Sequence, residues 1–554
     1  MMRFQGTTGG VAALAVVVMV GATLTLTAGA YPGAATNAGA AAEANAAAEA
    51  STAVKADRTP DLPLPAGAQA VMDKPQFASA SLGLLQTDAA GHVVQAHAAD
   101  QMFMPGSTAK LFSTSAAWKL LGADHKFTTP VYAVGSRDKS TLKGDLVLVG
   151  SGDLSLGGRT TKSGGIAWEN FDHADANSVP GAVLTPEDPL AGIKNLAAQV
   201  RKSGITRVDG NAMIDDRLFH STFEPDPTPV MINDNLIDLL ATPTTEGKDA
   251  TLTYRPHASS LKVVSDVKTV AAGQKSVLTI KGHAPGTIKV TGTIAADAKP
   301  MLQTADIADT ASFARTVFID ALKKEGVAVT AKATGTNPKV LPSAKTYTSK
   351  TKVAAYVSPP YKDYAKLILK VSHNLGANLA VCLLAVQAGK TDCNGGFAPM
   401  HAFLKKVGVD TTLVAQSDGR GGVPVDRVSP IALTQLLRYW LTQPDFDAFR
   451  ACLPILGVDG SLKDVQTSSP ARGKVMAKTG TVADLDRLNG RLTVQTKSLA
   501  GFFQAADGSW QVFNVVVNNV VVNNAGGDAT VQPILDANDD VGAIAASLWS
   551  AANP

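Results

Sequence analysis

The sequence lacks the signatures of several common protein classes. It contains no Gly-x-x-x-x-Gly-Lys-Ser/Thr loop that would cradle phosphates and no Cys/His spacing typical of zinc sites. Its 50 basic and 47 acidic residues leave a formal net charge of only +3. A nucleic-acid-binding protein usually has a clustered basic face. We therefore expect no nucleic-acid partner, no bound metal and no cofactor.

Cysteine is also scarce. The three cysteines are Cys382, Cys393 and Cys452, and an odd number permits at most one internal bridge. Cys382 and Cys393 are the nearest pair, either as a disulfide or as two buried free thiols. With 45% hydrophobic residues, the chain can build a large core and needs no disulfide framework.

Long apolar runs are missing except at the N-terminus. Arg3 precedes an uncharged stretch over residues 9–26, and Ala28-Gly29-Ala30 offers small residues for cleavage. This pattern predicts a secretory signal peptide over residues 1–30 and an exported, periplasmic or cell-wall-associated protein. The alternative is an uncleaved anchor, because the run approaches spanning length. A membrane would be a partner only in that case.

The rest of the chain divides by composition. Residues 31–65 form an Ala/Pro-rich linker. Residues 66–127 and 349–554 have the mixed helix and strand pattern of one α/β domain. Residues 128–348 contain short alternating runs separated by turn residues, which predict one inserted β-rich domain or two nested ones. Only the segments 190–202 and 312–324 interrupt this region with helical character.

Periodicity predicts the elements of the α/β domain. We expect early strands over 78–85 and 93–96 and a helix over 107–121. Further helices and strands follow the Pro359-Pro360 pair. We expect helices over 364–373, 375–387, 399–407, 430–442 and 531–552, and strands over 487–494, 498–504 and 512–519.

Three short motifs carry the chemistry. They are Ser107-Thr108-Ala109-Lys110, Ser372-His373-Asn374 and Lys478-Thr479-Gly480, the order found in penicillin-reactive serine enzymes. Other Ser-x-x-Lys matches lie in charged turns or polar, strand-like segments. Ser107 instead follows the Pro105-Gly106 break at the start of a helix, where unpaired backbone N–H groups can bind an oxyanion.

Lys110 is the natural base for Ser107. Three residues apart on a helix, the two side chains share one face. A serine hydroxyl needs a base before it can attack. A lysine can serve once burial or a second cation lowers its pKa, and we expect Lys478 to be that cation.

The other two motifs suit substrate binding. Lys478, Thr479, Gly480 and Thr481 lie where a strand is expected, and an edge strand can align an extended peptide. Gly480 would leave room for that approach, while Lys478 and Thr479 could bind a terminal carboxylate. Ser372 could relay a proton to a leaving amine and Asn374 could hold the substrate amide. The alternative for this motif is ordinary helix capping.

The ordered motifs and their contexts are similar to a known family, the class-C low-molecular-mass penicillin-binding proteins, or D-alanyl-D-alanine carboxypeptidase/endopeptidase family. The long separation of Ser107 and Ser372 resembles the large insert of that family. Likeness extends over most of residues 66–550, and four further segments agree: 144–153, 214–216, 417–419 and 453–462.

The resemblance implies a fold. The chain should have a serine β-lactamase/transpeptidase-like catalytic domain of the α/β class, with an antiparallel sheet, helices on both faces and a large β-rich insert. It also implies an activity, serine-type D-Ala-D-Ala carboxypeptidase, with DD-endopeptidase activity left open. The partners would be peptidoglycan stem peptides, with β-lactam antibiotics as inhibitors.

The resemblance also implies residue roles. Ser107 would form the acyl-enzyme and Lys110 would be the base, with the N–H groups of Ser107 and Thr481 as the oxyanion hole. Ser372 would protonate the leaving D-Ala, whose carboxylate Lys478 and Thr479 would hold. Water would then release the shortened peptide, whereas penicillin would stay attached to Ser107.

Three positions depart from the family pattern. His373 replaces the usual acidic residue, and Asn378 stands where relatives often have Glu. Arg420-Gly-Gly-Val-Pro424 replaces Ser-Gly-Leu-Ser-Arg near the substrate side-chain pocket, so Arg420 or Arg427 would have to substitute there. Two alternative functions stay open: a β-lactamase, and a catalytically idle peptidoglycan-binding relative. A Ser-His-Asp hydrolase is disfavoured because no Gly-x-Ser-x-Gly elbow occurs.

Overall fold

The computed structural model describes residues 59–178, 180–521 and 532–554. The predicted signal peptide and all but the last residues of the predicted linker lie outside the described residues. Within these three ranges, no helix combines the length and the apolar character needed to cross a bilayer.

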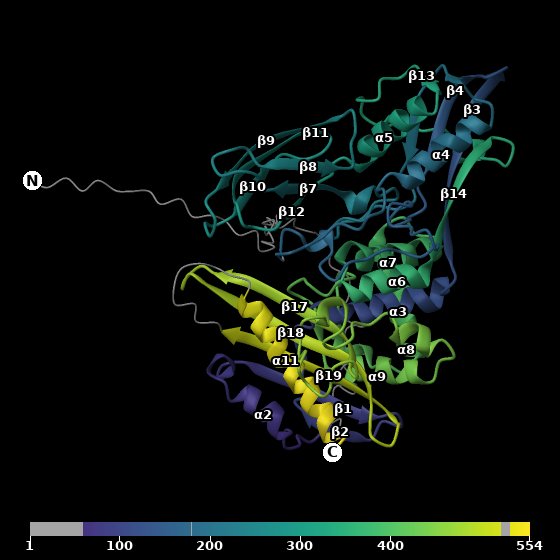
Figure 1. Cartoon of the computed structure of the whole chain (residues 1–554). Helices are drawn as coiled ribbons and strands as arrows, with labels where there is room; N and C mark the ends of the chain where they lie inside the picture. The colour runs from purple at the N-terminus through teal and green to yellow at the C-terminus, as the bar shows by residue number, and fades with distance from the viewer. Residues whose placement is uncertain (1–58, 179, 522–531) are drawn as a thin grey trace, which may run out of the picture.

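The lower half of the molecule is built on a five-stranded antiparallel sheet (Figure 1). β17 forms one edge of this sheet and β2 forms the other. In spatial order, the strands are β17 (Met476–Asp486), β18 (Arg491–Gln504), β19 (Trp510–Val521), β1 (Ser81–Asp88) and β2 (Val93–His97).

Helices cover both faces of this sheet, as alternate residues of one strand show. Phe513 and Val515 of β19 pack with α11 (Gln532–Ala551) and α2 (Ala66–Met72). Val512 on the opposite face packs with the central helices. Successive strand side chains point to opposite faces, so a strand buried on both sides reads as a continuous apolar run.

The central helices carry the first two motifs. α3 (Lys110–Leu121) lies beside α6 (Tyr361–Lys370) and α7 (Asn374–Gln387) (Figure 1). Trp118 of α3 packs edge-on against Trp440 and Phe449, with ring centroids 5.8 Å away in each case. The outer helices are α8 (Phe397–Lys406), α9 (Pro430–Leu441) and α10 (Phe446–Arg450).

The upper half belongs to the middle of the chain (Figure 1). The chain enters it along β3 (Lys126–Asp138) and returns along β14 (Lys352–Pro360), which pair antiparallel. α4 (Ala191–Lys202) and α5 (Thr310–Lys324) are its helices. Its main sheet also contains β4 (Thr141–Val149), β5 (Arg207–Val208), β6 (Ala212–Asp215) and β13 (Ala328–Val329).

Two three-stranded sheets complete the upper half, and all three sheets contribute to one hydrophobic core. The first has the order β12 (Met301–Asp306), β7 (Leu236–Thr242) and β8 (Thr251–Arg255). The second has the order β10 (Val277–Lys281), β11 (Gly286–Ala295) and β9 (Leu261–Val270).

Four predicted elements differ clearly from the structure. The two strands expected over 487–494 and 498–504 form the single strand β18, because no Gly or Pro separates them. The helix expected from Ser107 begins as a 3₁₀ turn, Gly106–Ala109, and becomes an α-helix only at Lys110. The helix expected over 364–373 ends at Lys370, because Ser372 adopts a left-handed conformation with φ of 61°.

The cysteine alternatives are also resolved. Cys382 of α7 and Cys393 form a disulfide across a sequence separation of 11 residues, and Cys452 is a buried free thiol. The bridge fixes the C-terminal half of α7 to the turn that leads into α8.

We expect replacement of both Cys382 and Cys393 by Ala to lower the free energy of unfolding by about 2–3 kcal/mol. A disulfide that closes a short loop restricts the unfolded chain by roughly this amount. Urea unfolding of the variant and the wild type, each with and without dithiothreitol, measures the change. A reductant effect of the same size on both proteins would contradict the prediction.

Candidate active site

The Ser107 turn is fixed to the central sheet by backbone carbonyls. The Pro105 carbonyl accepts hydrogen bonds from Ser498 Oγ at 2.6 Å and Thr108 Oγ1 at 2.8 Å. The preceding Met104 carbonyl accepts one from Thr496 Oγ1 at 2.7 Å. Gly106 has a φ of 53°, a conformation that glycine adopts without strain. The serine is therefore presented by a rigid turn.

Lys110 joins the first two motifs. Its side chain is fully buried, and Nζ lies 2.5 Å from Ser107 Oγ. The same Nζ donates to Asn374 Oδ1 at 2.8 Å and lies 3.3 Å from Ser372 Oγ. The Ser107 hydroxyl and a second hydroxyl thus share one buried amine that can act as the base, the arrangement that proton transfer at a serine requires.

Burial lowers the pKa of Lys110 to about 7, helped by the positive charge of Arg420 and opposed by Asp175 and Asp418. The second cation expected from the sequence was Lys478. That residue is itself fully buried, and burial together with Lys110 holds its pKa well below the usual range. Arg420 is a further positive charge that lowers the pKa of Lys110.

The third motif lies on the edge strand β17. Its outer edge pairs with no further strand among the described residues apart from a bridge between Ile455 and Met476 at its start, which leaves later backbone groups for an extended peptide. Lys478 Nζ donates to the Thr479 carbonyl at 2.7 Å, and the Thr479 and Ser461 hydroxyls are 2.7 Å apart. Lys497 Nζ donates to Thr481 Oγ1 at 2.6 Å.

Gly480 brings β17 against the Ser107 turn. A Cβ added at Gly480 would lie 3.1 Å from Ser107 N, and one added at Gly106 would lie 2.9 Å from Thr481 N. The backbone amides of Ser107 and Thr481 therefore approach each other across these two glycines. Two amides in such a position suit an oxyanion hole.

The Ser372 motif forms the turn between α6 and α7. Its helix cap is His373, whose Nδ1 accepts a hydrogen bond from Gly376 N at 3.0 Å. The side chains of Ser372 and Asn374 are directed to Lys110 instead of capping α7. Capping and active-site roles are thus divided among the three residues.

A cleft of about 860 Å³ opens at this site. It is lined by five of the residues selected from the sequence: Ser107, Ser372, Asn374, Thr479 and Thr481. Ser461, from the matching segment 453–462, also lines it, whereas Asn170, Phe171, Asp175 and Lys497 were not predicted from the sequence. The first three of these four come from the inserted region, far from any motif in sequence. No local pattern distinguishes them from ordinary polar or apolar residues.

Asp175 brings a titratable carboxyl group to the cleft. It is partly exposed there, and burial and Asp172 raise its pKa to about 6, opposed by His373, Lys110 and Lys478. The inserted region thus places a carboxyl group near the two central lysines.

Of the two arginines considered for the substrate pocket, only Arg420 lines the cleft. It is 8% exposed, and its Nε donates to Asp418 Oδ2 at 3.0 Å. Its buried Nη2 has no hydrogen-bond partner within the described chain. Arg427 instead donates to the carbonyls of Pro424 and Asp426, at 2.9 and 2.7 Å.

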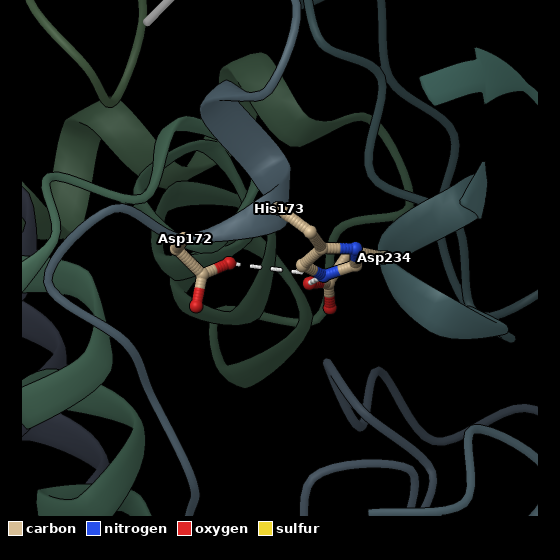
Figure 2. A group of neighbouring side chains, drawn as sticks. All are labelled: Asp172, His173 and Asp234. Carbon is tan, nitrogen blue, oxygen red and sulfur yellow. Dashed lines mark hydrogen bonds and ion pairs between the residues drawn. The ribbon is translucent and has the colours of Figure 1, made fainter. Parts of the chain in front are cut away.

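A buried charge cluster of the inserted region lies behind the Ser372 turn. Asp172, His173 and Asp234 place potential metal ligands within 4.8 Å of one another (Figure 2). Arg159 already fills the cationic role, because it donates to Asp172 at 2.6 and 2.8 Å and to Asp234 at 2.5 and 3.0 Å. We assign the cluster as an ion-pair network.

His173 adds a positive charge to this network. Burial lowers its pKa, but Asp238, 2.6 Å from Nδ1, and Asp234, 2.9 Å from Nε2, outweigh burial and raise it to about 9. Arg255 also pairs with Asp238, at 2.9 Å. The three carboxylates are therefore balanced by two guanidinium groups and one imidazolium, as buried charges require.

Comparison with known proteins gives a family match over almost the whole described chain. The model of the D-Ala-D-Ala carboxypeptidase 3 (S13) family matches residues 66–539. A D-alanyl-D-alanine carboxypeptidase from an Actinomadura species is 26% identical over 450 residues, covering 76% of this chain and 77% of the relative. Penicillin-sensitive carboxypeptidase A of Dictyostelium discoideum is 25% identical over 406 residues, covering 70% and 74%.

A solved structure supports the fold. Penicillin binding protein 4 (dacB) of Haemophilus influenzae superposes with a TM-score of 0.65 at 19% identity, covering 86% of this chain and 98% of that protein. The same protein in complex with a β-lactam gives a TM-score of 0.63 at 18% identity, covering 88% and 99%. The predicted transpeptidase-like fold class is confirmed.

We expect Gly480→Ala to reduce the rate of acylation by benzylpenicillin about a hundredfold. The new Cβ would lie 2.2 Å from Ser498 Oγ and 2.4 Å from the Pro105 carbonyl oxygen, so β17 and the Ser107 turn must separate. Displacement by about 1 Å can cost a factor of this size. Intact-mass kinetics measure the rate. Gly165→Ala, whose Cβ would meet nothing closer than 3.8 Å, is the control, and equal rates in both variants would contradict the prediction.

Proposed function

We propose that Ser107 is the nucleophile of this protein. The chain belongs to the D-Ala-D-Ala carboxypeptidase 3 (S13) family and is a serine-type carboxypeptidase. One observation carries the assignment: the buried Lys110 amine lies 2.5 Å from Ser107 Oγ. A lysine whose pKa is about 7 is neutral in a large fraction of molecules at neutral pH and can accept the serine proton.

In the first step, Ser107 Oγ attacks the carbonyl carbon of the penultimate D-Ala while its proton passes to Lys110 Nζ. The carbonyl oxygen becomes negatively charged and accepts hydrogen bonds from the N–H groups of Ser107 and Thr481. The close approach of these amides at Gly106 and Gly480 supports this role. Such donors stabilise the tetrahedral intermediate more than the substrate.

The intermediate then collapses to an acyl-enzyme and releases D-Ala. Ser372 passes a proton from Lys110 to the leaving amine, a role supported by the 3.3 Å between Lys110 Nζ and Ser372 Oγ. Lys478 and Thr479 hold the D-Ala carboxylate. The negative charge of the bound carboxylate favours the charged form of the buried Lys478, which can then pair with it. Asn374, 2.8 Å from Lys110 Nζ, orients the amide. Water then releases the shortened peptide.

The substrate class follows from the same family. We assign peptidoglycan stem peptides ending in D-Ala-D-Ala as substrates. β-Lactam binding is supported by a relative described as penicillin-sensitive and by a solved relative in complex with a β-lactam. Action on cell-wall peptides requires export, which the signal-like residues 1–30 favour.

The catalytic domain in this proposal comprises residues 66–127 and 349–554, with 128–348 as the inserted region. The hydrophobic clusters support the division. One cluster contains the strands and helices between Val131 and Ala354. The other links α3 to the later helices and to β18 and β19, and it also takes in Leu154, Ile166, Phe219, Phe223 and Met231, where the inserted region packs onto the catalytic domain.

We expect one benzylpenicillin to add covalently to each molecule of residues 59–554, and the adduct to be lost in Ser107→Ala. Intact-mass spectrometry detects the adduct, and peptide mapping locates it. Release of D-Ala from a D-Ala-D-Ala peptide by the wild type then tests peptidase activity. An adduct that persists in Ser107→Ala would contradict the assignment. Adduct formation followed by rapid β-lactam hydrolysis, without D-Ala release, would identify a β-lactamase.

We expect the acylation rate to increase with pH and to level off above a midpoint near pH 7. Only the neutral amine of Lys110 can act as base, and its pKa is about 7, so below that pH the rate should fall about tenfold per pH unit. Acylation kinetics between pH 5.5 and 9 measure the midpoint. Arg420→Gln removes a positive charge that lowers this pKa and should shift the midpoint upward. A flat profile between pH 6 and 8 would contradict the role of Lys110.

A further inference from the structure

Three consecutive residues of the inserted region share a backbone conformation that side chains disfavour. Asn233, Asp234 and Asn235 have φ values of 52°, 56° and 61°. Asn and Asp tolerate left-handed backbone better than other side chains, but a run of three is unusual, because left-handed residues normally occur singly. Conformations of this kind persist where surrounding structure enforces them, and they cluster at functional sites.

The left-handed turn directs Asp234 into the buried charge cluster. The residue is 5% exposed, and a single oxygen, Oδ2, receives all of its side-chain contacts. Arg159 donates from two nitrogens at 2.5 and 3.0 Å, and His173 Nε2 lies 2.9 Å away. His373 Nε2 makes the remaining contact, at 3.3 Å. Oδ1 has no partner within the described chain.

His373 connects this carboxylate to the catalytic motif. Its Nδ1 accepts the N–H of Gly376, so Nδ1 carries no proton, and in the neutral ring the proton is on Nε2. Nε2 faces Asp234 Oδ2 and donates to it. The two ring nitrogens thus bind the N-terminus of α7 and the inserted region at once. A carboxylate on one nitrogen fixes both the tautomer and the orientation of the ring.

The residues on either side of His373 are the ones that contact Lys110. Ser372 is left-handed, with φ of 61°, and its Oγ lies 3.3 Å from Lys110 Nζ. Asn374 Oδ1 accepts from the same amine at 2.8 Å. A shift of the His373 backbone would move both neighbours, because they are bonded to it at the junction where α6 ends and α7 begins.

We propose that Asp234 is a positioning residue of the active site: through His373 it holds the turn that carries Ser372 and Asn374 against Lys110. The inserted region then takes part in acylation although it supplies neither the nucleophile nor the base. This inference rests on the proposed role of Ser107 and Lys110.

A double-mutant cycle on full-length protein tests the link. His373→Asn keeps a capping oxygen for α7 but loses the contact with Asp234, and Asp234→Ala removes the carboxylate. Each single variant should lower the rate constant of acylation by benzylpenicillin about tenfold. In the His373→Asn background, adding Asp234→Ala should change that rate less than twofold, because the link is already broken. The affinity for unreacted benzylpenicillin, measured by calorimetry in the Ser107→Ala background, should stay within twofold.

Asp238→Ala is the matched control. Asp238 is a buried carboxylate of the same cluster that contacts His173, Arg255 and Asn233, whereas the contact of His373 is with Asp234. It should lower the melting temperature and leave the acylation rate of the folded protein within twofold of wild type. An Asp238→Ala loss as large as that of Asp234→Ala would overturn the proposal, as would a further tenfold loss in the double variant.

The two hypotheses fail in different ways. If Ser107 is not the nucleophile, the wild type forms no adduct that depends on Ser107. If Asp234 has no positioning role, the wild type is acylated at Ser107 and the His373→Asn variant reacts at an unchanged rate. If the Asp234→Ala variant does not fold, the acylation rate of the His373→Asn variant decides the question. A loss of about tenfold supports the positioning role, and an unchanged rate contradicts it.

Discussion

The site depends on one buried amine. Lys110 is enclosed on all sides, yet its Nζ lies within 3.3 Å of the oxygens of Ser107, Ser372 and Asn374. Burial disfavours the charged form of a lysine, while these oxygens and nearby carboxyl groups favour it. The outcome is a pKa of about 7. Because the three oxygens come from two separate motifs, this amine also determines how α3 must lie against the turn between α6 and α7.

Close backbone approach is the second constraint. The oxyanion hole proposed here needs two amides from different elements to point at one atom. Gly106 and Gly480 permit this because neither has a Cβ. A Cβ at Gly106 would press against the Thr481 nitrogen, and a Cβ at Gly480 would press against the Ser107 nitrogen. Hydroxyl groups of β18 and the Ser107 turn then bind the carbonyls of Pro105 and Met104. The glycines allow the approach, and these hydrogen bonds fix it.

The inserted region contributes charge to the site as well as shape. Its buried cluster contains Asp172, Asp234 and Asp238, balanced by Arg159, Arg255 and His173. Isolated, each of these groups would be costly to bury, but a complete network satisfies them together. Because His373 touches Asp234, the same network reaches the catalytic turn. The departure of this chain at position 373 is therefore matched by a partner more than a hundred residues away in sequence.

The sequence alone determined the three motifs and their order, because local chemistry is sufficient for both, and the resemblance that these motifs carry implied the class of fold. A serine after Pro-Gly at a helix start, with a lysine one turn later, indicates a nucleophile and a base without knowledge of the fold. Periodicity predicted the element types, but it predicted two strands where β18 is one. It also started the α-helix near Ser107 too early and ended the helix near Ser372 too late. The helix errors arose where turn geometry, and not hydrophobic pattern, decides the boundary.

Only the tertiary structure decided which charges act on Lys110 and what lines the cleft. Arg420 lowers the pKa of Lys110, and Lys110 lowers that of Lys478, through burial and distances that depend on packing between remote segments. Asp175 and Asp234 carry no local signature, since a carboxylate gains its meaning from its neighbours in space. The left-handed run at residues 233–235 was likewise invisible in the sequence, because surrounding contacts enforce a conformation that the residues tolerate but do not select.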